Sequence, residues 1–390
     1  MRQLAVAATS AATLLVALLP AAPAAAVLSL KWTDGPNVTP PLGTTGAEWR
    51  DVSASGPKDV WAAGVRRTPA DNPMTARWDG ASWAIVPVPA APAGQRYDLA
   101  AVDAVAPGDA WTVGSAGSAT AALHYDGTAW KAVATPVLAT GQSGRLTGVD
   151  VSATGGWATG WTAATGKPAQ PLVERWQKGS WSQVTVPTSD ATTGELSAVR
   201  VRADNDVWAV GSQVVAGRQT GLILHWDGTG WQEQAAPAVG ADGEETFLVS
   251  VAATGPDDAW AAGRLCRTTE LGESCRPLAL HYTAGKWTVQ PLGGAETELT
   301  EVVALAPDNV WVIGYASASA TFETDYAEHW DGTVFTPDAT IPNVPDDAST
   351  NAEMASALSA ATAIPGTGGV WAVGWIRDPL RGDAHVVHRD

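Results

Sequence analysis

The sequence predicts an all-β fold, a seven-bladed β-propeller with four-stranded blades, and three observations lead to this prediction. Twenty of the 390 residues are tryptophan, and seven of these stand in a repeated W-x-x-G motif. A second motif, [HR]-[WY]-D-G-x-x-W and its variants, follows six of the seven W-x-x-G motifs. The residues around both motifs are β-branched and aromatic, which favours strands over helices. The W-x-x-G motifs occupy residues 61–64, 111–114, 157–160, 208–211, 260–263, 311–314 and 371–374.

The spacing of the motifs sets the size of the repeat. The steps between the motif glycines are 50, 46, 51, 52, 51 and 60 residues. A period near 50 residues with strand-forming composition is typical of a propeller blade.

Each repeat reads as four strands. Strand a follows the pattern L-x-x-V-x-A, as at Leu99, Leu196 and Leu299. Strand b carries the W-x-x-G motif and is apolar throughout, which indicates burial on both of its faces between neighbouring blades. Strand c ends in the H-W-D part of the second motif, and strand d begins at its last aromatic residue. Between c and d, Asp-Gly predicts a two-residue hairpin turn with positive φ.

The two ends of the chain predict how the ring closes. The seventh repeat stops at residues 387–390, which align with strand c, so its strand d is missing. Near the other end, Lys31-Trp32-Thr33 matches the beginning of strand d. We therefore expect the N-terminal strand to complete the last blade, which would remove a free sheet edge.

The first 26 residues have the features of a secretory signal peptide. Arg2 precedes an apolar run from Leu4 to Leu19, and a small-residue segment ends at Ala26. These features predict cleavage after Ala26, export of the protein and no membrane insertion. Residues 27–390 would then form a single secreted, extracellular propeller domain.

Charge and cysteine content exclude several classes of function. The chain has 40 acidic and 23 basic residues, a formal net charge of −17, which disfavours binding to nucleic acid or to an anionic membrane. We expect a soluble monomer. The two cysteines, Cys266 and Cys275, are expected to form a disulfide after export. No set of metal ligands and no cofactor motif is recognisable, so no metal or cofactor is expected.

The repeat resembles those of secreted bacterial β-propellers, many of them uncharacterised, and more distantly those of kelch-like propellers. The resemblance covers residues 27–390 and rests on the W-x-x-G and D-G-x-x-W motifs. It implies the fold but no particular activity, because propellers serve as lectins, scaffolds, hydrolases, lyases and oxidases.

Most residues that resemble catalytic groups occupy repeat positions. Histidine or arginine occurs at one equivalent position in every blade, and residues at equivalent positions are spread around a ring, so they cannot converge on one ion. Aspartates two residues before the blade tryptophan, and those in the D-G turns, are read as structural because Asp bonds nearby backbone in turns. Only His385 lies outside this pattern. No catalytic constellation is recognisable. The residues at the shared position are Arg77, His124, Arg175, His225, His281, His329 and His388.

The loops that join b to c and d to a differ from blade to blade, whereas the other turns are uniform. Variable loops on a rigid scaffold are where binding sites usually lie. The residue after each motif glycine opens a b–c loop, and at this position Trp161, Arg264, Tyr315 and Trp375 suit contacts with a sugar ring or a protein. Acidic residues also precede several a strands and are expected to form an acidic ring at the mouth of the central channel. These residues are Glu48, Asp98, Glu195 and Glu298.

The function that this pattern favours is a secreted, non-catalytic binding module for a glycan or a protein ligand on the long-loop face. One alternative is an extracellular hydrolase or lyase that uses carboxylates at the channel mouth. Another is a structural subunit of a secreted or cell-wall assembly.

Overall fold

Seven four-stranded antiparallel sheets follow one another around a ring in the computed structural model of the chain. The structure describes residues 31–35, 46–67, 72–187, 191–239, 243–270, 272–294, 297–319, 322–342, 355–378 and 381–389. Lys31–Asp390 forms one compact unit, and the predicted signal peptide lies outside the described residues. The described part of the chain contains strands and no helix, so the predicted all-β seven-bladed propeller is confirmed.

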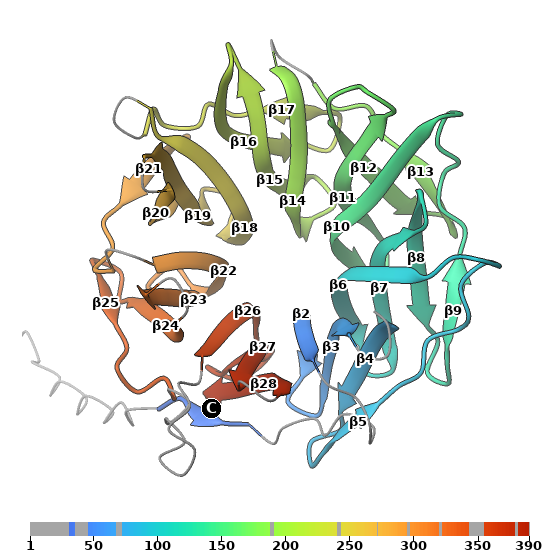
Figure 1. Cartoon of the computed structure of the whole chain (residues 1–390), viewed down its shortest axis with the longest axis horizontal. Coiled ribbons are helices and arrows are strands. Elements are labelled where there is room, and N and C mark those ends of the chain that lie inside the picture. Colours follow the sequence, from blue (N-terminus) through green and yellow to red (C-terminus); the bar gives the residue numbers. More distant parts are fainter. Residues whose placement is uncertain are drawn as a thin grey trace, which may run out of the picture. The chain divides into compact units, whose positions relative to one another are not determined.

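Each blade runs outward from an a strand near the centre to a d strand at the rim (Figure 1). The a strands are β2 (Ala47–Gly56), β6 (Tyr97–Ala106), β10 (Gln142–Ser152), β14 (Ala191–Ala203), β18 (Glu245–Gly255), β22 (Thr297–Ala306) and β26 (Ala355–Ala363). The b strands are β3 (Asp59–Arg66), β7 (Asp109–Ala116), β11 (Gly155–Ala164), β15 (Asp206–Val215), β19 (Asp258–Thr269), β23 (Asn309–Ser319) and β27 (Val370–Asp378).

The two outer strands of each blade are shorter on average. The c strands are β4 (Asn72–Trp78), β8 (Ala119–Tyr125), β12 (Gln170–Gln177), β16 (Arg218–Trp226), β20 (Gly272–Thr283), β24 (Phe322–Trp330) and β28 (Arg381–Arg389). The d strands are β5 (Trp83–Ile85), β9 (Trp130–Val133), β13 (Ser180–Gln183), β17 (Trp231–Glu233), β21 (Lys286–Gln290), β25 (Phe335–Pro337) and β1 (Thr33–Asp34).

The glycine of every W-x-x-G motif is required by a bulge in the neighbouring a strand. The pairing of β14 with β15 shifts register between Leu196 and Ala198, and this brings the carbonyl oxygen of Glu195 against Gly211. A Cβ atom added at Gly211 would lie 2.0 Å from that oxygen, and the glycines of the other six motifs meet an equivalent carbonyl at 1.9–2.1 Å. Only glycine allows such a close backbone approach.

The tryptophans of strands b and d form the contacts between blades. Each blade tryptophan is buried, and the first aromatic ring of strand d in the next blade packs edge-on against it. Trp130 meets Trp61 at a centroid distance of 5.1 Å and 77°, and Trp287 meets Trp208 at 5.3 Å and 88°. Edge-to-face aromatic pairs of this kind contribute beyond the area they bury. Trp49, in strand a of the first blade, is also completely buried.

The N-terminal strand closes the ring as predicted. β1 pairs antiparallel with β28, so the last sheet has the order β1-β28-β27-β26. Trp32 is only 3% exposed and packs edge-on against Trp311 at 5.6 Å and 84°, the same contact that the other strand-d tryptophans make. The amide of Gly35 adds a hydrogen bond of 2.9 Å to the carbonyl of Val386.

The turns between strands c and d differ in length from the prediction. In four blades the Asp-Gly pair begins a four-residue connection, such as the one between Trp78 and Trp83. The Asp79 carboxylate accepts hydrogen bonds from the amides two and three residues further on, while Gly80 has a φ of 97°. The predicted positive φ is confirmed. The turn is longer than predicted, because the Asp79 carboxylate takes the place of a backbone carbonyl as acceptor for the amide three residues further on. Two-residue turns with positive φ at both positions occur instead at Lys178-Gly179 and Ala284-Gly285.

The repeated histidines are held inside their own blades. His225 stacks on Trp208 at 4.2 Å, and its Nε2 lies 2.8 Å from Oδ1 of Asp206. The blades that carry His124 and His281 repeat this contact with an aspartate two residues before the blade tryptophan. These side chains are therefore fixed on separate blades and share no site, in agreement with their structural interpretation.

Candidate functional site

The two faces of the ring differ in their connections. On one face, only Pro57 and Lys58 separate β2 from β3, and two-residue links recur in the next five blades. The last blade differs, because residues 364–369 join β26 to β27. On the other face, called here the loop face, the d–a segments vary from the short stretch between β21 and β22 to the long one between β25 and β26. The predicted ligand-binding residues all open b–c hairpins on the loop face.

Two of these residues, Arg264 and Tyr315, meet at one carboxylate. Arg264 extends from β19 toward the next blade, where its Nη1 lies 3.3 Å from Oε2 of Glu298 in β22. Its guanidinium also lies 5.4 Å from the ring centroid of Phe247. Tyr315 lies opposite Glu298 in the β22–β23 pairing. Burial, the charge of Glu298 and a hydrogen bond to Glu298 raise the pKa of Tyr315 well above its usual value, so Tyr315 is a hydrogen-bond donor at all physiological pH values.

The other two predicted residues lie on different blades. Trp375 is partly exposed and lies opposite Ala357 of β26, in the blade after Tyr315. Trp161 is partly exposed in the third blade, opposite Arg145 of β10. Arg264, Tyr315 and Trp375 therefore occupy three successive blades, whereas Trp161 is placed on a separate part of the loop face.

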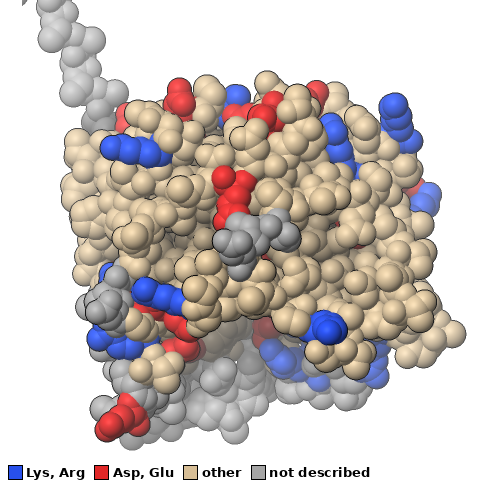
Figure 2. Space-filling model, turned by 90° about the horizontal axis from the view of Figure 1, so that it is seen from above, with Lys and Arg blue, Asp and Glu red and all other residues tan. Residues whose placement is uncertain are grey.

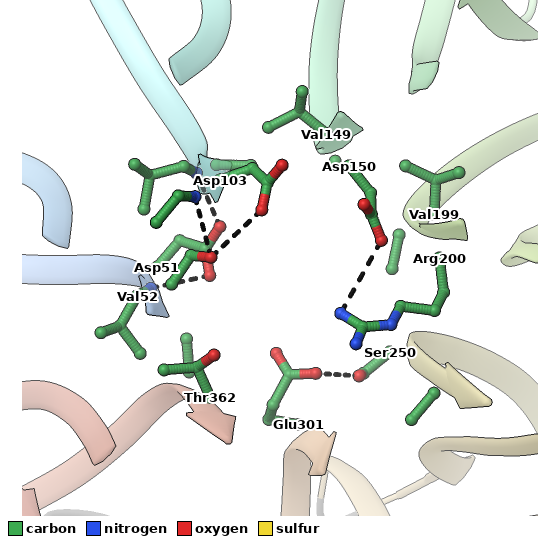
Figure 3. A pocket seen from close by; sticks show the side chains of 18 of the residues that line it. Asp51, Val52, Asp103, Val149, Asp150, Val199, Arg200, Ser250, Glu301 and Thr362 are labelled. Atoms are coloured by element: carbon green, nitrogen blue, oxygen red, sulfur yellow. Dashed lines mark hydrogen bonds and ion pairs between the residues drawn. The ribbon is translucent and has the colours of Figure 1, made fainter. Parts of the chain in front are cut away.

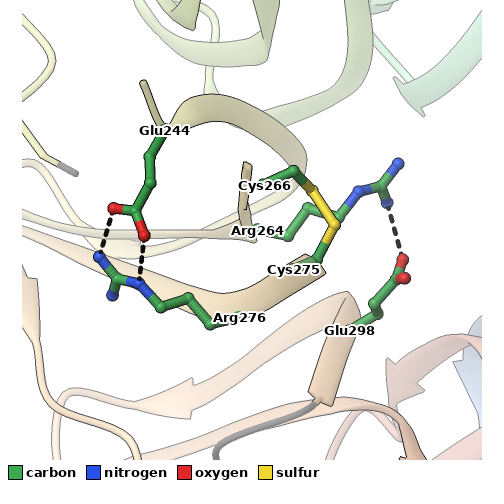
Figure 4. The surroundings of a disulfide bond; sticks show 6 residues. All are labelled: Glu244, Arg264, Cys266, Cys275, Arg276 and Glu298. Atoms are coloured by element: carbon green, nitrogen blue, oxygen red, sulfur yellow. Dashed lines mark hydrogen bonds and ion pairs between the residues drawn. A yellow bond between two sulfur atoms is a disulfide. The ribbon is translucent and has the colours of Figure 1, made fainter. Parts of the chain in front are cut away.

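The hairpin that carries Arg264 is held rigidly. Cys266 and Cys275 are directly opposed in the β19–β20 pairing, with their Sγ atoms at the bonding distance of 2.07 Å (Figure 4). On one flank, Arg276 forms a two-bonded ion pair with Glu244, with contacts of 2.9 and 3.2 Å. The two cysteines predicted the disulfide from the sequence. No sequence motif predicts the ion pair, because it joins Glu244, in the loop before β18, to Arg276 in β20.

The acidic residues that precede the a strands are largely matched by arginine. Glu48 contacts both Arg50 and Arg67, and Asp98 contacts both Arg50 and Arg145. The Glu298–Arg264 pair extends this pattern, whereas Glu195 is exposed opposite Ser212. The expected ring of acidic residues is thus an alternation of acidic and basic side chains for much of its circumference.

A second group of carboxylates, not singled out by the sequence analysis, lines the central channel. The channel encloses a cavity of about 590 Å³ bounded by the a strands of all seven blades. Figure 3 shows Asp51, Asp103, Asp150 and Glu301 pointing toward its middle, together with Arg200. Nη1 of Arg200 lies 3.7 Å from Oδ2 of Asp150.

The channel side chains connect the inner strands of neighbouring blades. Oδ2 of Asp51 accepts the amide of Val102 at 2.7 Å, and Oδ2 of Asp150 accepts the amide of Val201 at 2.9 Å. Oδ2 of Asp103 likewise accepts a hydrogen bond from the amide of Val151, in the third blade. Inner strands of different blades do not pair with each other, so these carboxylates provide acceptors for amides that have no strand partner.

The position of these acids on the wall of the channel changes their proton affinity. Burial raises the pKa of Asp51 to about 7. Burial and the neighbouring charge of Asp150 raise the pKa of Asp103 to about 8, while burial and the charge of Asp51 raise that of Glu301 to about 8. The pKa of Asp150 is also raised by burial. The channel therefore holds carboxyl groups that exchange protons near neutral pH.

A signal for the channel acids exists in the repeat itself. In the pattern L-x-x-V-x-A, the residues immediately before and after the valine position face the channel, and most blades have small or hydroxyl side chains there. Asp51 and Glu301 precede this position, and Asp103, Asp150 and Arg200 follow it. Aligning the a strands and looking for charged exceptions would have identified all five residues.

A smaller cavity of about 390 Å³ lies on the loop face of the first blade. It is bounded by the end of β3, the start of β4, the segment after β5 and the residues that lead into β6. Among the described residues that line it, Arg66 and Arg96 are the charged ones. No sequence motif marks this cavity.

The described residues give no support to a metal centre or a membrane span. The one set of three potential ligands within ion-binding distance is Cys266, Glu273 and Cys275, and both of its sulfur atoms are used in the disulfide. Among the described residues, no helix is long and apolar enough to cross a membrane. Figure 2 shows a side of the molecule where acidic and basic side chains are scattered over a largely uncharged surface.

Comparison with known proteins gives a likeness of fold. No family model and no curated protein sequence matches the chain. Among solved structures, a polysaccharide lyase, an ulvan lyase bound to -[GlcA(1-4)Rha3S]-, has a TM-score of 0.58 at 10% identity and covers 92% of this chain and 94% of its own. The protein U3-55K has a TM-score of 0.56 at 10% identity, with 92% and 98% covered.

YCF48 from Cyanidioschyzon merolae is similar over the same share of the chain, with a TM-score of 0.52 at 13% identity and 92% and 98% covered. One of the three proteins is named as an enzyme, so the likeness does not separate a binding protein from an enzyme. At these identities it shows the architecture alone. By fold, the chain is a seven-bladed β-propeller with distant propeller neighbours.

Proposed function

We propose that the protein is a secreted, non-catalytic binding module whose glycan or protein ligand contacts the loop face. The observation that carries the proposal is the β19–β20 hairpin, which a disulfide and the Arg276–Glu244 ion pair hold in place. Such a hairpin loses little conformational freedom when a ligand binds, and this favours affinity. Arg264, Tyr315 and Trp375 place a guanidinium, a phenol and an indole ring on three successive blades, and Glu298 orients the first two.

The bonds of the channel carboxylates support a binding role over a catalytic one. Asp51, Asp103 and Asp150 each use an oxygen to accept an amide of the next blade. A carboxylate held in this way contributes to the contact between blades, and removing it would leave a buried donor unsatisfied. At the loop-opening position, three other blades have Val65, Ser115 and Ser212, so the repeat does not require large side chains there.

Capture experiments test the binding proposal. The purified mature protein would be applied to a glycan array and used to capture proteins from culture supernatant. Trp375→Ala and Tyr315→Ala should weaken capture without unfolding the protein. Thr128→Ala, an exposed change in the turn between β8 and β9 on the opposite face, is the matched control and should bind normally. Loss of binding in the control alone would show that the ligand contacts the other face.

One observation favours a second candidate, an extracellular hydrolase or lyase. Burial raises the pKa of Glu301 to about 8 in a cavity of about 590 Å³, and a carboxyl group whose pKa is raised toward neutrality could act as a general acid. Turnover of polysaccharide or ester substrates by the wild type, lost in Glu301→Gln, would support this candidate. Capture of one constant protein partner, with no glycan binding, would instead support a structural subunit of a secreted assembly.

A further inference from the structure

The cavity on the loop face of the first blade differs in charge from the rest of the molecule. The chain carries 40 acidic and 23 basic residues. Yet among the described residues that line this cavity, Arg66 and Arg96 are charged and no carboxylate is present. The cavity therefore favours a negatively charged group, by charge complementarity with its own lining.

Arg66 differs from three other arginines of the loop face. Arg67, Arg145 and Arg264 each form an ion pair with a carboxylate. In contrast, Nε of Arg66 is buried and has no hydrogen-bond partner, and Arg66 forms no ion pair within the described part of the chain. A charged group whose donors are left unsatisfied costs free energy, so the guanidinium of Arg66, which is partly exposed, has bonding capacity that the described part of the chain does not use.

The walls of the cavity are apolar and stiff. Met74, Ile85 and Val88 line it, and the prolines at 73, 87 and 89 restrict the backbone on both sides. Thr75 holds the base in place, because its hydroxyl donates a hydrogen bond of 2.6 Å to the carbonyl of Val86 and accepts one of 3.0 Å from Nε1 of Trp130. The cavity is thus formed before any ligand arrives, and its volume is within the range of ligand sites.

These features favour a peptide over an acidic sugar. A sugar ring needs an exposed aromatic face and several polar partners for its hydroxyls, but Tyr97, the aromatic residue of the described lining, is only 7% exposed. A carboxylate next to an apolar side chain matches an arginine next to apolar walls. Peptide segments supply this combination in adjacent residues.

We propose that this cavity is a second binding site of the protein, which takes a peptide segment with a carboxylate beside apolar side chains and pairs that carboxylate with Arg66. The inference rests on the proposed binding function and adds a location separate from blades five to seven. The carboxylate pairs with the partly exposed guanidinium of Arg66, and the apolar side chain packs against Ile85 and Val88, which are also partly exposed.

Two matched peptide pools test the proposal. One pool contains fluorescein-labelled hexapeptides with glutamate flanked by leucine, valine or phenylalanine, and the other has glutamine in place of the glutamate. Fluorescence anisotropy should show binding of the glutamate pool that is about tenfold tighter, as expected for one charge-assisted pair. Arg66→Gln should reduce this binding to the level of the glutamine pool, and because Nε makes no bond, the melting temperature should be unchanged. Arg267→Gln, which removes an exposed charge elsewhere on the loop face, should bind like the wild type.

Three outcomes would overturn the proposal: no binding of either pool, equal binding of the two pools, or unchanged binding in Arg66→Gln. Binding of polygalacturonate in place of the glutamate pool would overturn the assignment to a peptide. Trp375→Ala separates the two proposals, since it should leave peptide binding at Arg66 intact. If the peptide pools fail while ligand capture remains sensitive to Trp375→Ala, the proposed function stands and the site at Arg66 does not.

Discussion

Replacing Glu301 by glutamine should make the protein more stable at pH 8 than the wild type. Glutamine has nearly the same shape and keeps one oxygen that can accept the hydroxyl of Ser250 or the amide of Val302, the two groups that Glu301 now binds. The substitution therefore removes the titration of the carboxyl while it retains the contact between the fifth and sixth blades.

The sign of the effect follows from the raised pKa. An unfolded glutamate titrates near 4.5, whereas burial raises the pKa of Glu301 in the folded protein to about 8. Between these values, the folded state holds a proton that the unfolded state has released, so stability falls as the pH rises through this interval. Below pH 4.5 both states are protonated and no stability is lost. Above pH 8 both are ionised and the loss is complete.

The size of the effect is limited by solvent in the channel. Each unit of pKa difference corresponds to about 1.4 kcal/mol, so the interval from 4.5 to 8 sets an upper limit of about 5 kcal/mol. Glu301 is only partly buried, so water in the channel reaches its carboxyl group. Since this water stabilises the ionised carboxylate, we expect about 1–2 kcal/mol between pH 5 and pH 8.

Urea titrations followed by tryptophan fluorescence at pH 5, 6, 7 and 8 measure this difference. Glu195→Gln, which changes an exposed glutamate at the loop-face end of β14, is the matched control and should follow the wild type at every pH. The reasoning is refuted if Glu301→Gln also runs parallel to the wild type from pH 5 to pH 8. It is equally refuted if the variant becomes relatively less stable as the pH rises.

Three further predictions concern the frame of the propeller. Trp32→Ala should cost roughly 3–5 kcal/mol and promote aggregation, because it opens the last blade at β28; an unchanged melting temperature and a monodisperse elution profile would contradict this. Trp208→Ala should cost a similar roughly 3–5 kcal/mol and Trp375→Ala much less, because the first ring is completely buried and the second partly exposed; equal losses in denaturant titration would remove the distinction. Reduction of the Cys266–Cys275 bond should lower stability by no more than roughly 3 kcal/mol, since the loop it closes is short, and mass spectrometry of the purified protein should show no free thiol.

The sequence by itself determined the number of blades, their strand order and the way in which the ring closes. These features are repeated, and each repetition adds to a pattern that a single strand could not establish. Trp32 shows how far this extends, because its match to the strand-d tryptophans predicted a pairing with residues more than 350 positions away. The face with variable loops also followed from the repeat, because strand direction alone decides which turns lie together.

Only the tertiary structure decided which charged groups meet. Asp51, Asp103 and Glu301 lie on separate blades and become neighbours because the ring places its a strands around one channel. The partners of the acidic residues on the loop face are likewise set by the reach of side chains between blades, as with Arg264 and Glu298. Repeat patterns specify backbone hydrogen bonds and buried faces, whereas contacts between blades depend on the angle and distance at which the blades pack. For the same reason the unpartnered Nε of Arg66 could be recognised only in the folded chain.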